Sequence, residues 1–201
     1  MKGWLFTMRG MQLLTVSFRM SLVCMVLCGL LYNLAVTGIA QGIMPGRASG
    51  SLVTDPSGTV VGSALIGQAV TDPAYFQSRI SSIAYKADGS GTPNYAPSNP
   101  ELLKRVAQSI QDWQANNPDV PVALLPIDLV TNSGSGLDPH ISPAAAMAQI
   151  PRISKLTGLP QERLKTLVQE HTEQREFGFL GEPAVNVLKL NLALQALSKK
   201  P

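Results

Sequence analysis

Charged residues are scarce in this chain, and cysteine is almost absent. Asp, Glu, Lys and Arg together make up 14% of the 201 residues, where about a quarter is usual, and there are two cysteines. This composition excludes a charge-driven disordered protein, a coiled coil and a disulfide-built scaffold. The apolar share of 45% is ordinary for a folded protein, so we expect one domain with an appendage.

Common catalytic and binding motifs are also missing. The sequence has no Walker A motif, no GxGxxG after a predicted strand and no Asp-Lys-Thr-Gly-Thr phosphorylation motif of P-type ATPases. It has no HExxH or CxxC spacing, so it specifies no metal site. A serine triad would use Ser135, His140 and Asp128 or Asp138, but the glycines around Ser135 lack the GxSxG spacing. We therefore expect no enzymatic activity from the chain by itself.

The excess positive charge lies in the first 46 residues. Lys2, Arg9 and Arg19 occur there without an acid, whereas residues 47–201 hold 13 basic and 13 acidic side chains. A neutral body lacks the basic surface that nucleic-acid binding needs, so we expect no nucleic-acid partner. Basic residues placed before an apolar run instead indicate how the chain is oriented in a membrane.

The run from Met20 to Ala40 is apolar and contains no charged residue. A bilayer core of about 30 Å needs about 20 apolar helical residues, so the run predicts a transmembrane helix at 20–41. A secretory signal peptide is the alternative, since Gly38 and Ala40 form a small-x-small site. The apolar core of a signal peptide is usually shorter, at about 7–15 residues, which favours the transmembrane helix.

The positive-inside rule sets the expected topology. Residues 1–19 remain in the cytoplasm, and residues 42–201 form an extracytoplasmic soluble domain of a single-pass protein of the cell inner membrane. Asn33 lies inside the apolar run, where a polar side chain gains from a partner, so it predicts a neighbouring membrane helix.

The pattern of residues 42–201 predicts a single mixed α/β domain, which makes the fold class α+β with one N-terminal transmembrane helix. A hairpin is expected from 51–53 and 59–66, joined by a turn at Asp55–Gly58. Further strands are expected at 127–130 and 177–180.

Four helices are expected in the domain, each marked by a starting residue. Ser98 and Glu101 form a capping box for the first. Its predicted buried stripe is Leu103, Val106, Ile110 and Trp113. Ser142 caps the second helix, which Pro151 interrupts and Gly158 ends. The other two helices begin at Pro160 and Asn186, although alternating leucines at 188–194 leave a strand open as the alternative for the last one.

The polar, Gly-rich loop at 131–140 is the candidate binding site. Backbone N–H groups in such a loop, directly before a helix N-terminus, are a common place for anions and phosphates. The candidate contacts to a nucleotide or a partner are Ser133, Gly134, Ser135, Gly136 and, on the following helix, Gln149. The alternatives are an ordinary turn that starts a helix and a glutamine that faces water.

Five ordered segments resemble one family. They are Gly62-Ser-Ala-Leu-Ile-Gly-Gln68, Pro97-Ser-Asn-Pro100, the run from Asp128 to Ala146, Gln149-Ile-Pro-Arg152 and the run from Gly181 to Leu194. Together they resemble the C subunit of the Kdp potassium-transporting P-type ATPase over nearly the whole chain. The family's Phe-x-x-Arg-Pro-Ser-Ala is retained only as Phe76 and Arg79, and the 80–95 loop departs from the family pattern, which puts any role of that loop in doubt.

The resemblance implies an accessory subunit of a high-affinity, ATP-driven potassium uptake pump. Its implied partners are a channel-like potassium-translocating subunit, a P-type ATP-hydrolysing subunit and a small membrane subunit. It also implies a stabilising role and a catalytic chaperone role that raises the ATP affinity of the P-type subunit. No cofactor is expected on the chain itself, because the partner subunits handle ATP and potassium. A secreted or membrane-anchored extracytoplasmic binding protein is the alternative function.

Overall fold

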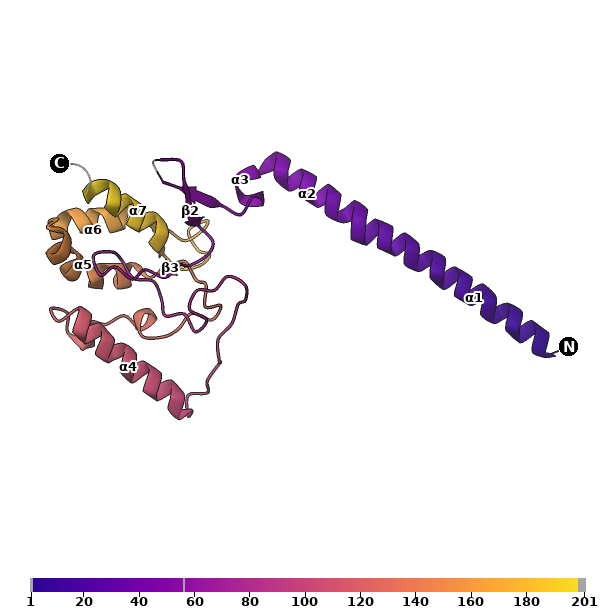
Figure 1. Cartoon of the computed structure of the whole chain (residues 1–201), viewed down its shortest axis with the longest axis horizontal. Helices are drawn as coiled ribbons and strands as arrows, with labels where there is room; N and C mark the ends of the chain where they lie inside the picture. Colours follow the sequence, from indigo (N-terminus) through magenta and orange to yellow (C-terminus); the bar gives the residue numbers. More distant parts are fainter. Residues whose placement is uncertain (1, 56, 199–201) are drawn as a thin grey trace. The chain divides into compact units, whose positions relative to one another are not determined.

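The computed structural model describes residues 2–55 and 57–198 (Figure 1). The chain divides into two compact units, with the boundary between Ser51 and Leu52. Each unit has its own secondary structure, and each is described by itself.

The first unit is helical almost throughout. Helix α1 (Lys2–Cys24) continues through a π-helical stretch, η1 (Met25–Leu31), into α2 (Tyr32–Ile43), and a short α3 (Pro45–Ala48) follows. The part from Gly10 to Ile43 is 34 residues long and contains an 18-residue stretch with a mean hydropathy of 2.1, so it is long and apolar enough to cross a membrane. The helix therefore extends well beyond the predicted span in the N-terminal direction.

The amide of Asn33 is hydrogen-bonded within its own helix. Its Nδ2 donates to the carbonyl oxygen of Gly29 at 2.8 Å and to that of Cys28 at 3.3 Å. Both acceptors lie in the π-helical stretch, where the regular i to i−4 pairing is displaced. The Nδ2 donors thus have backbone acceptors within the helix, and the neighbouring membrane helix stays a prediction.

The second unit opens with the predicted hairpin. Strands β1 (Leu52–Thr54) and β2 (Val60–Ser63) pair antiparallel, with Leu52 opposite Ser63. The Asp55 carboxylate accepts hydrogen bonds from the backbone N–H groups of Ser57 and Thr59, both at 2.9 Å, which closes the turn as an Asx motif.

Helix α4 (Pro100–Asn116) begins one residue later than predicted. Asn99, not Ser98, is the N-cap, and its side-chain oxygen accepts from the N–H of Glu101 at 2.8 Å. Trp113 is buried as predicted, but Leu103 is 63% exposed and so does not belong to the buried stripe. Leu102 is the half-buried residue at that end of the helix, because the helix presents this side chain to the domain.

The strand predicted at 127–130 is wrong. The chain instead forms two short 3-10 turns, η2 (Val122–Leu124) and η3 (Ile127–Leu129). Each turn follows a proline, Pro121 or Pro126, whose carbonyl oxygen accepts from the N–H three residues later. Proline fixes φ and lacks an N–H donor, so both starts favour tight turns over a strand ladder.

A small antiparallel sheet forms the second unit's other β-structure. Its strands are β3 (His140–Ile141), β4 (Thr172–Glu173) and β5 (Ala184–Asn186), in the order β3-β5-β4. Strands of two or three residues are too short to show a period-2 pattern, so the sequence did not predict them. The strand predicted at 177–180 is wrong: only one isolated bridge, between Glu176 and Leu180, occurs there.

Three helices pack beside this sheet: α5 (Pro143–Thr157), α6 (Gln161–Glu170) and α7 (Val187–Ser198). Ser142 caps α5 as predicted, and Gly158 ends it with a left-handed φ of +74°. Pro151 does not interrupt α5, which remains helical on both sides because its buried face packs against the core along its length. The last segment is a helix and not a strand.

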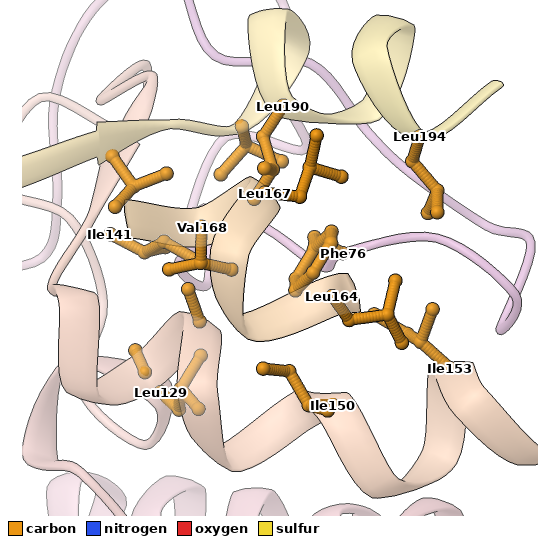
Figure 2. Packing of buried hydrophobic residues seen from close by; sticks show 14 of the residues in the cluster. Phe76, Leu129, Ile141, Ile150, Ile153, Leu164, Leu167, Val168, Leu190 and Leu194 are labelled. Atoms are coloured by element: carbon orange, nitrogen blue, oxygen red, sulfur yellow. The ribbon is translucent and has the colours of Figure 1, made fainter. Parts of the chain in front are cut away.

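The hydrophobic core lies between these helices. Figure 2 shows the Phe76 ring among aliphatic side chains of α5, α6 and α7, and Phe76 has no exposed surface. The side chains around it that are fully buried include Ile153, Leu164, Leu190 and Leu194. The architecture is thus the expected α+β class, one long apolar N-terminal helix followed by a mixed α/β domain.

Candidate functional site

The Gly-rich loop before α5 has a buried base and an exposed tip. Ser133 and Gly136 are buried, whereas Gly134 and Ser135 are exposed. The Ser133 hydroxyl accepts from the Gly136 N–H, and the Ser135 hydroxyl accepts from the Leu137 N–H, both at 3.1 Å. The loop is thus a folded turn held by its own serines.

The divergent 80–95 segment is hydrogen-bonded to this loop. Ser81 Oγ donates to the Gly136 carbonyl oxygen at 2.6 Å, and the Gly91 N–H donates to the Ser135 carbonyl oxygen at 2.8 Å. Gly136 has a φ of +72°, and a Cβ placed there would lie 2.6 Å from Ile83 Cγ1. Only glycine fits this conformation and this space.

Several of the expected anion donors are used inside the protein. The N–H of Ser133 donates to the Ile80 carbonyl oxygen at 2.9 Å, and those of Gly136 and Leu137 bind loop hydroxyls. An outside group would therefore meet the loop at its exposed tip, Gly134 and Ser135.

A line of alternating basic and acidic side chains, the charge line, runs from this loop across the small sheet. Arg79 Nη1 lies 2.9 Å from Asp138 Oδ2, and His140 Nδ1 lies 3.7 Å from Asp138 Oδ1. The other ring nitrogen, His140 Nε2, lies 3.6 Å from Glu173 Oε2, and Glu173 Oε1 lies 2.9 Å from Lys189 Nζ. The line joins the Phe76–Arg79 segment, the loop, β3, β4 and α7, so it fixes the loop relative to the sheet.

The Asp138 carboxyl has a lowered pKa, about 2 instead of 3.8. Burial acts in the opposite direction and raises it, but hydrogen bonds from His140 and the charged Arg79 guanidinium outweigh burial. The Glu173 pKa is also lowered, chiefly by the hydrogen bond from Lys189. Both carboxylates are therefore held in their ionised form.

The lowered pKa of Asp138 predicts a loss of stability in acid. The contribution is fully present above pH 3.8 and is lost as the pH falls through about 2. Because the side chain is 30% exposed, we expect a contribution of about 1–2 kcal/mol. Urea unfolding of the full chain in detergent checks this: the difference between wild type and Asp138→Asn should shrink between about pH 4 and pH 2.

The matched control for this prediction is Asp119→Asn, which alters an exposed carboxylate outside the charge line. The free energy of unfolding of this variant should differ from that of wild type by nearly zero at every pH. A difference for Asp138→Asn that is unchanged down to about pH 2 would contradict the assigned role of the carboxylate.

Gln149 is buried and holds the core segment around Phe76. Its Oε1 accepts from the Gln77 N–H at 2.8 Å, and its Nε2 donates to the Gln77 carbonyl oxygen at 3.2 Å. Asn191 makes the same pair of bonds with Phe76, both at 2.9 Å. Each side-chain amide thus pairs with both the N–H and the carbonyl oxygen of one residue, as a neighbouring β-strand does in a sheet. Gln149 does not face water, and the structure does not bring it to the exposed loop tip.

Arg152 completes this network from the next turn of α5. It is 7% exposed and donates through Nε to Asn117 Oδ1 at 2.9 Å and through Nη2 to Gln149 Oε1 at 2.7 Å. Its Nη1 donates to the carbonyl oxygens of Pro73 and Tyr75. Burial lowers the pKa of the guanidinium, which arginine tolerates without losing its proton. Arg152 therefore anchors the irregular 73–77 segment on α5.

A cavity of about 330 Å³ lies beside Arg152. Its lining includes Asp112, Trp113 and Asn117, so it offers hydrogen-bond donors and acceptors as well as side chains of both charges. The Ser133–Gly136 loop does not line it. Within residues 2–55 and 57–198, no group of three or more His, Cys, Asp or Glu side chains is placed to hold a metal ion.

The structure does not assemble the serine triad. Ser135 Oγ pairs with Ser133 Oγ and the Leu137 N–H, and Asp128 accepts from the N–H and hydroxyl of Ser142 at the start of α5. Of the triad residues, Asp138 and His140 lie near each other, with His140 Nδ1 3.7 Å from Asp138 Oδ1.

Sequence reasoning missed Arg79, Arg152 and Asn117 as site residues, and it considered Asp138 only as a member of a serine triad. A signal existed for Arg152, because Gln149 and Arg152 are three apart on a predicted helix and so share a face with Ile153. No local signal pointed to Asn117, whose partner is distant in sequence.

Known proteins match this chain over most of its length. The family model described as "K+-transporting ATPase, c chain" (KdpC) matches residues 14–196. A relative from Bacillus cereus (strain B4264), a potassium-transporting ATPase KdpC subunit, is 59% identical over 188 residues, covering 94% of this chain and 97% of the relative. A KdpC subunit from Bacillus anthracis is 57% identical with the same coverage.

These matches do not favour the alternative of a free-standing binding protein, since the relatives are named as subunits of an ATPase. They span both the apolar helix and the α/β domain, so the resemblance seen in the sequence motifs is confirmed. The chain belongs to the KdpC family, the c chain of potassium-transporting ATPases.

Proposed function

We propose that this chain is a non-catalytic accessory subunit that stabilises a high-affinity, ATP-driven potassium uptake pump. The family match over residues 14–196 is the observation that carries the proposal. The sequence lacks both a P-loop and the phosphorylation motif of P-type ATPases, which supports ATP hydrolysis on another subunit.

The proposed partners are a channel-like potassium-translocating subunit, a P-type ATP-hydrolysing subunit and a small membrane subunit. These partners handle potassium and ATP, and the chain needs no cofactor of its own. A 34-residue apolar helix supports assembly within the membrane, where helices associate by close packing and interhelical hydrogen bonds.

The proposed topology is a single pass through the cell inner membrane, with residues 1–19 in the cytoplasm, 20–41 in the bilayer and 42–201 outside. Lys2, Arg9 and Arg19 support this orientation. Protease added to right-side-out spheroplasts should therefore digest the chain beyond about residue 45. Full protection in spheroplasts, with digestion in inverted vesicles, would show the opposite orientation.

The proposed mechanism is that of a catalytic chaperone, in which the chain raises the ATP affinity of the P-type subunit. A domain outside the cytoplasm cannot reach cytoplasmic ATP, so the effect travels through the helix or acts at the potassium entrance. The exposed tip of the Ser133-Gly134-Ser135-Gly136 loop is the proposed partner contact, and buried Gln149 supports the domain by holding the backbone of Gln77.

Binding of an ATP analogue to membranes containing the other pump subunits tests the chaperone proposal. Adding the full chain should tighten binding about fivefold or more, a usual size for coupling between sites. The loop variant Gly134→Asp should weaken this effect. The control Ala107→Asp adds the same charge at an exposed position of α4, and it should act as wild type. An ATP affinity that does not change at saturating chain would contradict the chaperone role.

A further inference from the structure

Two phenylalanines lie at the tip of the connection between β4 and β5. The Phe turn, Glu176–Leu180, is closed by two backbone hydrogen bonds: the Glu176 N–H donates to the Leu180 carbonyl oxygen and the Leu180 N–H to that of Glu176, both at 2.9 Å. Arg175, just before the turn, lies with its Nη2 2.6 Å from Oε2 of Glu182, just after it, and this ion pair joins the two ends of the turn. The turn is therefore a defined structure and not an open loop.

The backbone of the Phe turn holds an unfavourable conformation. Phe177 has a φ of +51° and Gly178 a φ of +80°. The left-handed region suits glycine but is uncommon for an aromatic residue. An asparagine at 177 would tolerate the same backbone more easily, so folding alone does not explain the phenylalanine.

The apolar side chains of the turn face water. Phe177 is 86% exposed, the highest value among the large apolar side chains whose exposure the structure describes, and Phe179 is 70% exposed. Neither belongs to the core cluster or to the side chains packed against it. Two exposed aromatic side chains in one short turn of a folded domain are typical of a contact surface.

An acidic hollow of about 240 Å³ adjoins the turn. Its lining includes His140, Glu173, Glu176, Leu180 and Glu182. Glu173 and Glu182 already have ion-pair partners in Lys189 and Arg175, so Glu176 is the carboxylate of the hollow that favours a positively charged group from outside.

We propose that the Phe turn and the acidic hollow together form a docking surface for a partner subunit of the pump. The partner offers an apolar pocket for Phe177 and Phe179 and, beside it, a lysine or arginine that enters the hollow near Glu176. This inference rests on the proposed function, because it requires that the chain works in a complex.

The charges at the turn argue for a protein partner and against a lipid surface. The chain segment 173–182 contains three glutamates and one arginine, and that arginine is paired with Glu182. Anionic headgroups would be repelled by this segment, and segments that bind membrane surfaces usually carry basic side chains around their aromatic residues.

Co-purification from detergent-extracted membranes tests the docking surface with the complete pump and the full chain. The double variant Phe177→Asn, Phe179→Ser should recover about tenfold less chain with a tagged P-type subunit, the size expected when aromatic anchors are removed. Glu176→Lys should also lower recovery by reversing a charge of the hollow. The thermal unfolding midpoint of each variant is measured as well. A midpoint at or above that of wild type shows that the lower recovery comes from lost docking and not from lost folding.

The matched control is Leu124→Ser, Ile127→Ser, since these side chains are 69% and 75% exposed on another part of the same unit. It should co-purify as wild type. Equal recovery of the Phe177, Phe179 double variant and wild type would overturn the docking surface. A failure of wild-type chain to co-purify would instead overturn the proposed function. A photo-reactive phenylalanine analogue at position 179 should cross-link to a pump subunit, and labelling of lipid alone would also overturn the proposal.

Discussion

Arg152→Ala should lower the free energy of unfolding of the unit that begins at Leu52 by about 3–5 kcal/mol, the usual cost of breaking a buried charged network. The guanidinium supplies donors to Asn117, to Gln149 and to the carbonyl oxygens of Pro73 and Tyr75. Without it, these acceptors lose their donors at a place where Asn117 and Gln149 are themselves buried, and each unmet acceptor is costly. Domains are stable by about 5–15 kcal/mol, so the variant should lie close to unfolding.

Urea unfolding of the full chain in detergent measures this effect, followed by Trp113 fluorescence in a Trp4→Phe background. Arg152→Lys should be intermediate, because lysine retains the charge but not the planar set of donors. The control Arg163→Ala removes an exposed arginine of α6 and should change stability by less than about 0.5 kcal/mol. A midpoint for Arg152→Ala equal to that control would show that the network does not hold the segment.

The sequence predicted those parts of the fold whose signals are local. Ser142 with Pro143, and Gly158, fix the ends of α5 through cap chemistry that involves neighbouring residues only. Asn186 likewise caps α7, accepting from the Lys189 N–H at 3.2 Å. The prediction of Ser98 as the N-cap of α4 was wrong because Ser98 and Asn99 are both suitable caps, and Asn99 is the one that accepts the first backbone N–H.

The parts that the sequence did not predict depend on contacts between distant residues. Segment 73–79 has no regular structure and is held by side chains from α5 and α7, through Gln149, Arg152 and Asn191. The predicted loop is a folded Gly-rich turn, and its role as a binding site stays a prediction. The partners of its backbone groups were not predictable, because the Ile80 carbonyl oxygen and the Gly91 N–H belong to residues more than 40 positions away in the sequence.

Omitting this chain from the pump should remove potassium-stimulated ATPase activity from purified membranes. The chain matches the c-chain family from the apolar helix to the last helix, so the whole protein is expected to work in the complex. The other subunits should also co-purify poorly with one another when the chain is missing. Resupplying wild type or Arg163→Ala should restore activity, whereas Arg152→Ala should restore less because its domain is close to unfolding.

Growth at limiting potassium tests the central claim most directly. A strain that depends on this pump and lacks only this chain should fail to grow at very low potassium, should grow normally at high potassium, and should recover when the chain is supplied. Normal growth of the deletion strain at micromolar-range potassium through the same pump, with unchanged ATPase activity, would contradict the claim that the chain is a working subunit of a potassium uptake pump.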